Sequence, residues 1–257
     1  MHRFFIPPEW IHQEKVVITG KLVHQLRNVL RLSGGDHIVV LDNTGWEYEV
    51  ALKVVARGYV EGVVRGKRSI GEPSMKVNLY QALLKGNKFE FILQKCTELG
   101  VSGFVPILCE RCVVGHPKVK RVERWHRIIS EAAEQSRRGK LPILEPALTF
   151  QQACRSAMGF SLLSWEGEKA LGLRSALRSE IYRQRIISAR NPLSVNLFIG
   201  PEGGFSYSEV EFAQNCGILP VSLGSRVLRA GTAGLVAATA ILYECGDLDP
   251  PISSASA

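Results

Sequence analysis

The sequence lacks the short motifs that would assign a common function directly. No G-x-G-x-x-G pattern follows a predicted strand, and no G-x-x-x-x-G-K-[ST] phosphate-binding loop exists. There is also no H-E-x-x-H metal motif and no G-x-S-x-G nucleophile elbow. These absences argue against the phosphate of a nucleotide as the ligand, and against metalloprotease or serine-hydrolase chemistry.

Long apolar segments and disulfide spacing are missing as well. The longest strongly apolar run is GLVAATAILY, residues 234–243, well short of the roughly 18 residues that span a bilayer. The opening MHRFFIPPEW lacks the apolar core of a signal peptide. The six cysteines are scattered and do not form the framework of a secreted domain. We therefore expect a cytoplasmic protein with no membrane partner.

One cysteine pair needs separate mention. Cys109 and Cys112 form a C-x-x-C, and His116 follows, but no fourth residue has the spacing of a zinc ligand. The strand–C-x-x-C–helix arrangement of a redox protein is also absent. We interpret the pair as structural and expect no metal.

The size and charge of the chain suggest two domains and a polyanionic partner. The chain has 257 residues, which suits two domains. Its formal net charge is +8 and its sequence pI is about 9.3. Such an excess of basic residues favours a nucleic acid over a membrane surface as the partner. The alternative is that the charge serves only to keep the protein soluble.

The pattern of elements changes along the chain. Residues 1–70 contain mostly short alternating strands and predict a small β-barrel, interrupted by a helix in KLVHQLRNVLRLSGG with Leu22, Leu26, Val29 and Leu30 on its buried side. The charged segment 65–76 reads as a linker. Residues 74–247 alternate strand with helix, which predicts an α/β domain with a mostly parallel sheet. We expect the tail, residues 248–257, to be disordered.

The segment LFIGPEGGFSYSEVE predicts a strand, a glycine-rich turn and a helix in direct succession. Residues 195–199 have the composition of a buried strand, and Ser206 with Glu209 forms a capping box that starts a helix. Between them lie Gly200, Gly203 and Gly204, which let a ligand approach the backbone. Such turns at the carboxyl ends of parallel strands bind ligands in α/β folds. A tight connection that needs glycine for shape alone is the alternative.

A second glycine-ended strand follows in LPVSLGSRVLRAGTAG. It ends at Gly224, and Arg226 and Arg229 lie close to the turn. These arginines are either solvated surface charges or part of a site. Two glycine-ended strands in succession predict two walls of one pocket, which would hold its ligand by backbone groups with one carboxylate nearby.

Basic residues also recur at helical spacing in both halves of the chain. We predict RNA phosphate contacts from the following residues: His24, Arg27, Arg31, Arg124, Arg127, Arg137 and Arg138. A solvated helix face, with Arg127 and Glu131 paired four residues apart, is the alternative for the second group.

Several stretches, in this order, resemble one family. They are MHRFF, HQLRNVLRLSGGD, KCTELGV, ERC, ISEAAEQSRR, IGPEGGFSYSEVE and LGSRVLRAGTA. Over about residues 1–247 the chain resembles the bacterial small-subunit ribosomal RNA uridine-N3 methyltransferases, the RsmE type, of the SPOUT superfamily. The resemblance implies an N-terminal PUA-like RNA-binding barrel and a C-terminal SPOUT domain with a trefoil knot, which departs from the rule against threaded loops. It also implies a homodimer that binds S-adenosyl-L-methionine and methylates a uridine of 16S rRNA near the decoding centre.

The resemblance also places the cofactor. It implies contacts from these residues: Leu163, Ile199, Gly200, Pro201, Glu202, Gly203, Gly204, Leu223, Gly224, Val227, Leu228, Thr232 and Ala233. One departure stands out, because the family usually has Glu where this chain has Gly231 near the start of the last helix. That loss is either structural or weakens cofactor or RNA binding.

For the reaction we expect Arg229 and Arg226 to stabilise the uridine anion that forms when N3 loses its proton. Glu202 is a candidate proton acceptor or holds the methyl donor, and no residue is a clear general base. Two rival functions remain open. One is a SPOUT methyltransferase acting on tRNA or another rRNA site. The other is an RNA-binding ribosome-assembly factor with weakened catalysis.

Overall fold

The computed structural model describes residues 1–187 and 193–249 of the chain. Contacts divide these residues into two compact units. The first contains Met1–Glu72 and Ser130–Leu141, and the second contains Pro73–Ile129 and the described residues from Pro142 onward. The predicted barrel of residues 1–70 did not include the second segment of the first unit. Most of the predicted tail, residues 250–257, lies outside the described residues.

The first unit is built on a six-stranded sheet with the order β1-β4-β5-β6-β3-β2. β1 and β4 pair in parallel, and the other neighbours pair antiparallel. The strands have these bounds: β1 His2–Phe5, β2 Ile11–His12, β3 Lys15–Thr19, β4 His37–Leu41, β5 Trp46–Val55 and β6 Tyr59–Ser69. A 3₁₀ turn, η1, covers Pro8–Trp10. Alternate residues of these strands face a core that includes Phe4, Ile18, Ile38 and Leu52.

The predicted helix in the first unit is shorter and wound differently. α1 spans only Lys21–His24 and continues as a π-helical turn, η2, over Gln25–Val29. The wider turn rotates the following side chains relative to an α-helix. As a result Val23 and Leu26 are buried, whereas Val29 is 63% exposed. The prediction of Val29 on the buried side was therefore wrong.

The connection between the units is shorter than predicted. β6 extends through Ser69, and β7 begins at Lys76. Only residues 70–75 are therefore outside strands, because residues 65–69 of the expected linker continue β6.

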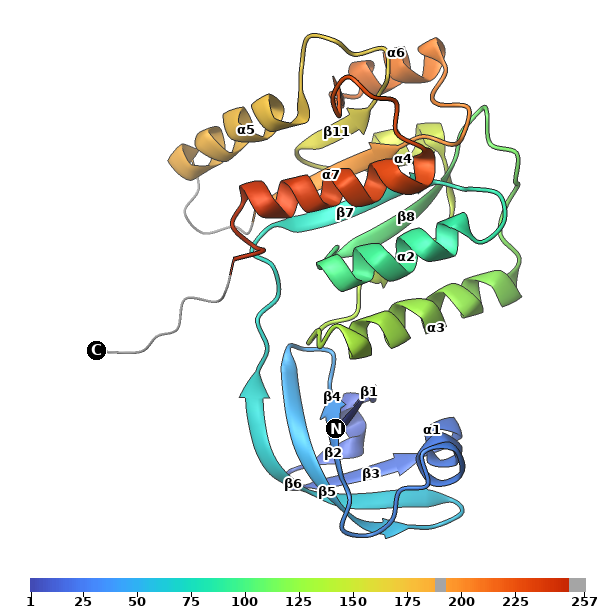
Figure 1. The fold of residues 1–257 in the computed structure, drawn as a ribbon, viewed down its shortest axis with the longest axis vertical. Helices are drawn as coiled ribbons and strands as arrows, with labels where there is room; N and C mark the ends of the chain where they lie inside the picture. The colour runs from blue at the N-terminus through green and yellow to red at the C-terminus, as the bar shows by residue number, and fades with distance from the viewer. Residues whose placement is uncertain (188–192, 250–257) are drawn as a thin grey trace. The chain divides into compact units, whose positions relative to one another are not determined.

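The second unit is an α/β structure in which helices flank a parallel sheet (Figure 1). The strand order is β10-β8-β7-β12-β11-β13, and β9 pairs with β8. Every pair in it is parallel. The strands have these bounds: β7 Lys76–Ala82, β8 Gly103–Leu108, β9 Ile143–Leu144, β10 Leu148–Thr149, β11 Ser161–Ser164, β12 Ser194–Ile199 and β13 Leu219–Val221.

Helices cover both faces of this sheet. The helices are α2 Lys88–Leu99, α3 Val119–Gln135, α4 Phe150–Ser156, α5 Leu173–Ile187, α6 Tyr207–Asn215 and α7 Ala230–Glu244. Only the part of α3 before Ser130 belongs to this unit. α2, α5, α7 and Trp125 of α3 contribute to one apolar cluster, and α4 and α6 contribute to the other. The two clusters lie on opposite faces of the sheet, because successive side chains of a strand point to opposite faces. In β12, for example, Leu197 belongs to the first cluster and Phe198 to the second. Within residues 1–187 and 193–249, each helix is too short or too polar to span a lipid bilayer.

Because the strands are parallel, their carboxyl ends lie along one edge of the sheet. β11, β12 and β13 end there at Ser164, Ile199 and Val221. The loops that leave these three ends form the site described next.

Candidate functional site

A cavity of about 900 Å³ lies at this edge of the second unit. Small-molecule sites typically occupy about 300–1,000 Å³, so it has the size of a ligand pocket. It is lined by residues that follow β11, β12 and β13, by the start of α2 and by the start of α7. The sequence prediction of one pocket between the two glycine turns is therefore matched by the geometry.

The first wall is the loop after β12, residues 200–205, which we call the glycine loop. Gly204 has φ of +68°, a conformation that side chains rarely adopt. A Cβ on Gly200 would lie 3.2 Å from the ring of Phe205, so the loop is also tightly folded on itself. The N–H of Gly204 donates to the carbonyl of Pro201 at 3.0 Å. Gly200, Pro201, Glu202 and Gly204 all line the cavity.

The predicted capping box fixes the end of this loop. Ser206 accepts a hydrogen bond from the backbone N–H of Glu209, and the Glu209 side chain accepts one from the N–H of Ser206. α6 accordingly begins at Tyr207. Both cap residues are buried, so the junction of loop and helix is held away from solvent.

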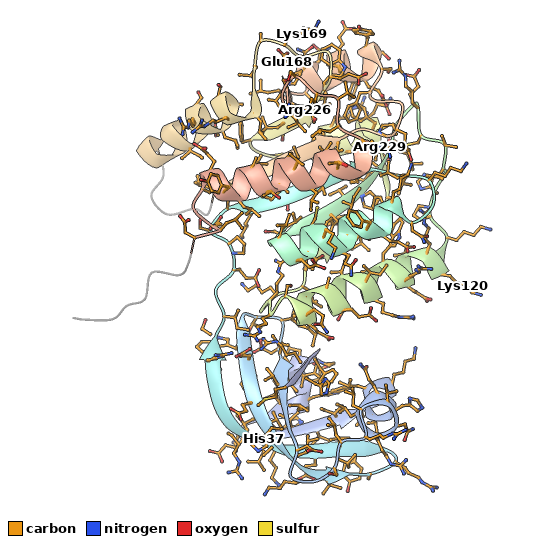
Figure 2. All side chains as sticks on the ribbon, viewed as in Figure 1. His37, Lys120, Glu168, Lys169, Arg226 and Arg229 are labelled. Atoms are coloured by element: carbon orange, nitrogen blue, oxygen red, sulfur yellow. The ribbon has the colours of Figure 1, made fainter. Side chains whose placement is uncertain are left out.

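The second wall is the segment after β13, residues 222–229, which we call the arginine loop. Gly224 has φ of +114°, and its N–H donates to the hydroxyl of Ser222 at 3.2 Å. Arg226 lies in this loop and Arg229 at the N-cap of α7 (Figure 2). Both arginines are exposed and line the cavity. Leu223, Gly224, Val227 and Leu228 of this loop also line the cavity, as do Thr232 and Ala233 at the start of α7.

Two predicted cofactor residues do not line the cavity. Leu163 is fully buried in the cluster beneath α4 and α6, because strand alternation turns its side chain into the core. The next residues, Ser164, Trp165 and Glu166, reach the cavity instead. Gly203 faces Arg111, and a Cβ added to Gly203 would lie 3.2 Å from the Cβ of Arg111. The side chain of Leu163 and the outward face of Gly203 are therefore not parts of the wall.

The third wall was not predicted from the sequence. Asn87, Lys88 and Phe91, at the start of α2, line the cavity. Nζ of Lys88 lies 2.8 Å from Oε1 of Glu202, which joins this wall to the glycine loop. Phe91 is 48% exposed, although the neighbouring Phe89 is buried. The apolar periodicity of α2 predicted the buried side and gave no signal for a site on the opposite face.

The carboxylate of Glu202 is held in its charged form. Burial alone would raise the pKa of Glu202, but the hydrogen bond from Lys88 and those from the backbone N–H groups of Glu202 and Lys85 lower it below its usual value. The cavity thus has an ion pair of Glu202 and Lys88 beside the glycine loop and the positive charges of Arg226 and Arg229 on the arginine loop.

The C-x-x-C lies in the loop after β8 and is compact. The N–H of Cys109 contacts Sγ of Cys112 at 3.3 Å, and the N–H of Cys112 donates to the carbonyl of Cys109 at 3.0 Å. Within the described part of the chain, no three His, Cys, Asp or Glu side chains are grouped as a metal site.

The predicted RNA-contact residues differ in their surroundings. In the first unit His24, Arg27, Arg31 and Arg137 are exposed. In the second unit Arg127 is exposed, and Arg124 forms an ion pair with Glu90 at 2.7 Å.

Arg138 is the exception among these residues. It is 7% exposed and forms an ion pair with Glu72 at 2.7 Å. Its burial removes it from the surface, so the geometry does not support the predicted RNA contact. Arg138 was predicted from helical spacing with Arg124 and Arg127, but α3 ends at Gln135 and the chain turns inward after it.

Comparisons with known proteins agree with this geometry. Residues 71–242 match the model of an RNA methyltransferase domain. The chain is 38% identical to a Synechocystis protein named ribosomal RNA small subunit methyltransferase E, over 92% of this chain and 75% of that protein. It is 34% identical to the Bacillus subtilis protein of the same name, over 88% of this chain and 89% of that one.

A solved structure extends the likeness to the fold. The ribosomal RNA small subunit methyltransferase E of Neisseria gonorrhoeae, bound to S-adenosyl methionine, superposes with a TM-score of 0.80 at 28% identity, covering 95% of this chain and 97% of that one. The family model covers well over half of the chain, and both sequence relatives exceed 30% identity. The chain therefore belongs to the family of RNA methyltransferases that contains the ribosomal RNA small subunit methyltransferase E proteins.

Proposed function

We propose that this chain transfers the methyl group of S-adenosylmethionine to N3 of one uridine in 16S rRNA of the small ribosomal subunit. Membership of the family, and a related structure that binds S-adenosyl methionine, support the enzyme class and the cofactor. One observation carries the proposal for this chain. Its cavity is bounded by a glycine-lined turn on one side and by two exposed arginines on the other.

The residues present suit the cofactor. The glycine loop offers backbone N–H and carbonyl groups with few side chains in the way, as a bent ligand with many polar groups requires. Glu202 places a carboxylate at the wall, where it attracts a positively charged sulfur. The residues assigned to the cofactor are Ile199, Gly200, Pro201, Glu202, Gly204, Leu223, Gly224, Val227, Leu228, Thr232 and Ala233.

When bound, the cofactor supplies an electrophilic methyl group on a sulfonium. A uracil base must lose its N3 proton to accept that group, and the ring then carries negative charge. Arg226 and Arg229 hold positive charge at the cavity wall, where it stabilises this anion. Glu202 is already paired with Lys88 and has a lowered pKa, which suits holding charge in the site better than removing a proton.

The α2 wall suits the entry of a nucleotide. Phe91 presents an exposed aromatic surface at the cavity, and Lys88 lies one helical turn before it. Bases that leave an RNA helix stack on aromatic side chains, and nearby cations attract the phosphates. In the first unit, the basic residues His24, Arg27, Arg31 and Arg137 suit further RNA contacts.

The remaining parts of the proposal rest on the family resemblance. They are a PUA-like RNA-binding barrel over residues 1–70, a knotted SPOUT domain over residues 74–247, a homodimer and a cytoplasmic location. The basic net charge suits an RNA partner, and the division into two units suits a chain with an RNA-binding part and a catalytic part.

The experiment is nucleoside mass spectrometry of 16S rRNA from a strain that lacks this protein. We expect N3-methyluridine to be missing there, to return with the wild-type gene, and to stay missing with Arg229→Ala. Arg174→Ala, which changes an exposed arginine on α5, is the matched control and should restore it. Normal N3-methyluridine in the deletion strain would overturn the proposal. Loss of a different methylated nucleoside would support the rival substrate, and failure to bind S-adenosylmethionine in calorimetry would support the assembly factor.

A further inference from the structure

The loop after β8 contacts the glycine loop from outside the cavity. Nη1 of Arg111 donates to the carbonyl oxygen of Gly203 at 2.8 Å. The stem of the same arginine packs against Gly203, since a Cβ at that position would lie 3.2 Å from the Arg111 Cβ. Arg111 does not line the cavity. Its contacts therefore support the back of the cofactor wall and leave the front of the wall unchanged.

Glu110 makes a second connection, at the start of α6. The hydroxyl of Ser206 donates to Oε2 of Glu110 at 2.7 Å. The N–H of Glu110 donates to Oε1 of Glu209 at 2.8 Å, and the other oxygen of Glu209 accepts from the N–H of Ser206. The carboxylate that completes the capping box is thus shared with the β8 loop. This network connects two segments that are 96 residues apart in sequence.

The β8 loop is itself fixed to the sheet. Cys109 and Cys112 close it through the contacts described above, and Sγ of Cys112 lies 3.6 Å from the carbonyl oxygen of Leu83, just beyond β7. Cys109 is buried in the same apolar cluster as Phe205 of the glycine loop. Arg111 and Glu110 therefore project from a rigid base toward a loop that contains three glycines.

Holding this loop in one shape has a direct effect on binding. Glycine-rich segments lose more conformational freedom than others when they are ordered. A ligand that must order its own binding loop binds less tightly than one that meets a preformed loop. Contacts made behind the wall do not touch a ligand in the cavity, so they act on its affinity through this ordering term.

We propose that Arg111, assisted by Glu110, is a positioning residue that keeps the glycine loop in its cofactor-binding shape and thereby sets the affinity for S-adenosylmethionine. The inference rests on the proposed function, because it takes the glycine loop as the cofactor wall. It assigns Arg111 no part in the chemical step, since the side chain lies outside the cavity.

Steady-state kinetics on small ribosomal subunits and calorimetry with S-adenosylmethionine test the proposal. Loss of a hydrogen bond from a charged group should raise Kd and KM for S-adenosylmethionine about tenfold in Arg111→Ala, with kcat within about twofold of wild type. Arg111→Lys keeps the charge and the stem and should recover part of the loss. Arg174→Ala, which removes an exposed arginine of α5 paired with Glu244, should leave both constants unchanged. Unchanged affinity in Arg111→Ala, or a fall in kcat alone, would overturn the proposal.

Hydrogen exchange of the unliganded protein separates this idea from the proposed function. The peptide that covers the glycine loop should exchange faster in Arg111→Ala than in wild type, while peptides of α5 stay unchanged. If wild type binds no S-adenosylmethionine, the proposed function fails, yet faster exchange would still show that Arg111 holds the loop. Equal exchange in the two proteins would show that Arg111 does not hold it.

Discussion

Lys88 and Glu202 connect two walls of the cavity through an ion pair of 2.8 Å between Nζ and Oε1. Lys88 is the first residue of α2, and Glu202 is the middle of the glycine loop. The backbone N–H of Lys85 approaches the same oxygen at 3.4 Å. These partners stabilise the charged carboxylate of Glu202 and hold the glycine loop. The same contacts make Glu202 a poor general base.

Replacing Glu202 by Gln should therefore reduce methylation only modestly. A general base contributes about 10²- to 10⁴-fold, whereas we expect kcat to fall by less than about tenfold and KM for the cofactor to rise. The measurement is single-turnover methylation from pH 6 to pH 9, with Lys88→Gln as the matched variant. A loss in kcat of a hundredfold or more, together with a lost acid limb of the pH profile, would restore Glu202 as the proton acceptor.

The same ion pair predicts how stability responds to acid. Because the pKa of Glu202 is lower in the folded protein than in the unfolded chain, the pair contributes stability at neutral pH and loses it as the pH falls through the depressed pKa. Urea unfolding at pH 7 and pH 3 should show a smaller acid-induced loss for Glu202→Gln than for wild type.

Arg229→Ala should separate chemistry from cofactor binding. If its guanidinium stabilises the uridine anion, kcat should fall by about 10²- to 10³-fold, the range for loss of one such donor. Its side chain is exposed, so its removal should leave the loops in place, and calorimetry should show nearly unchanged affinity for S-adenosylmethionine. Arg226→Ala tests the neighbouring cation in the same way. A native rate in Arg229→Ala would remove this residue from the mechanism.

The parts of the site that depend on nearby residues were predictable. Ser206 and Glu209 are three residues apart, and the capping box they form fixed the start of α6 at Tyr207 as expected. The two glycine turns were likewise visible, because each directly follows a short apolar strand. The segment WEYEVALKVV, residues 46–55, likewise predicts a strand by its alternation of apolar and polar residues, and β5 spans Trp46–Val55.

What the sequence could not show depends on distant residues. Lys88 and Phe91 reach the cavity because the sheet order places β7, the strand before α2, beside β12, the strand before the glycine loop. Arg138 becomes buried by pairing with Glu72, 66 residues earlier in the chain. Within β5, bulges near Glu49 and Leu52 interrupt the alternation, so Trp46 and Val54 are exposed although strict alternation would place them on one face with the buried Val50.

Gly231 occupies a position where the family usually has Glu. The structure has room for a Glu side chain at this position. No atom lies within 4 Å of a Cβ built on Gly231, and its φ is ordinary. It lies in the first turn of α7, which has no acidic residue. Glu is the better helix former and complements the helix dipole, so Gly231→Glu should raise the free energy of unfolding by about 1–2 kcal/mol.

Gly231→Gln is the matched control for this substitution, because it adds the side chain without its charge. Urea unfolding should place Gln between Gly and Glu. A destabilised Gly231→Glu would show that the carboxylate meets an unfavourable environment at the cavity wall, and that the departure from the family is compensated elsewhere.

Cys112 should be the more reactive cysteine of the C-x-x-C. The hydrogen bond from the Cys109 thiol lowers the pKa of Cys112 to about 7, against the effect of burial, whereas the pKa of Cys109 is raised. Alkylation by iodoacetamide, followed by peptide mass spectrometry, should show a rate at Cys112 that rises with a midpoint near pH 7. Cys109→Ala removes the donor and should move this midpoint upward. Equal rates at Cys109 and Cys112 would contradict the assignment.

Glu72 should be among the costliest polar residues to remove from the first unit. Its Oε2 accepts from Nε and Nη2 of Arg138 at 3.2 and 2.7 Å, and its Oε1 accepts from the N–H groups of Gly139 and Lys140 at 2.9 and 3.0 Å. Removing one partner of a buried ion pair costs about 3–5 kcal/mol, because the remaining charge stays buried. Glu72→Ala should lower the free energy of unfolding by that amount.

Glu98→Ala provides the control for this prediction, since Glu98 pairs with Lys95 on the surface of α2 and such pairs contribute about 0–1 kcal/mol. Chemical unfolding of both variants distinguishes an ion pair with a buried arginine from an exposed pair, and similar losses would contradict a structural role for the pairing of Glu72 with the buried Arg138. Arg138→Ala completes the test of the RNA prediction. If Arg138 only contacted RNA, this variant would bind RNA less tightly and keep its free energy of unfolding. Because Arg138 pairs with Glu72, we expect the free energy of unfolding to fall.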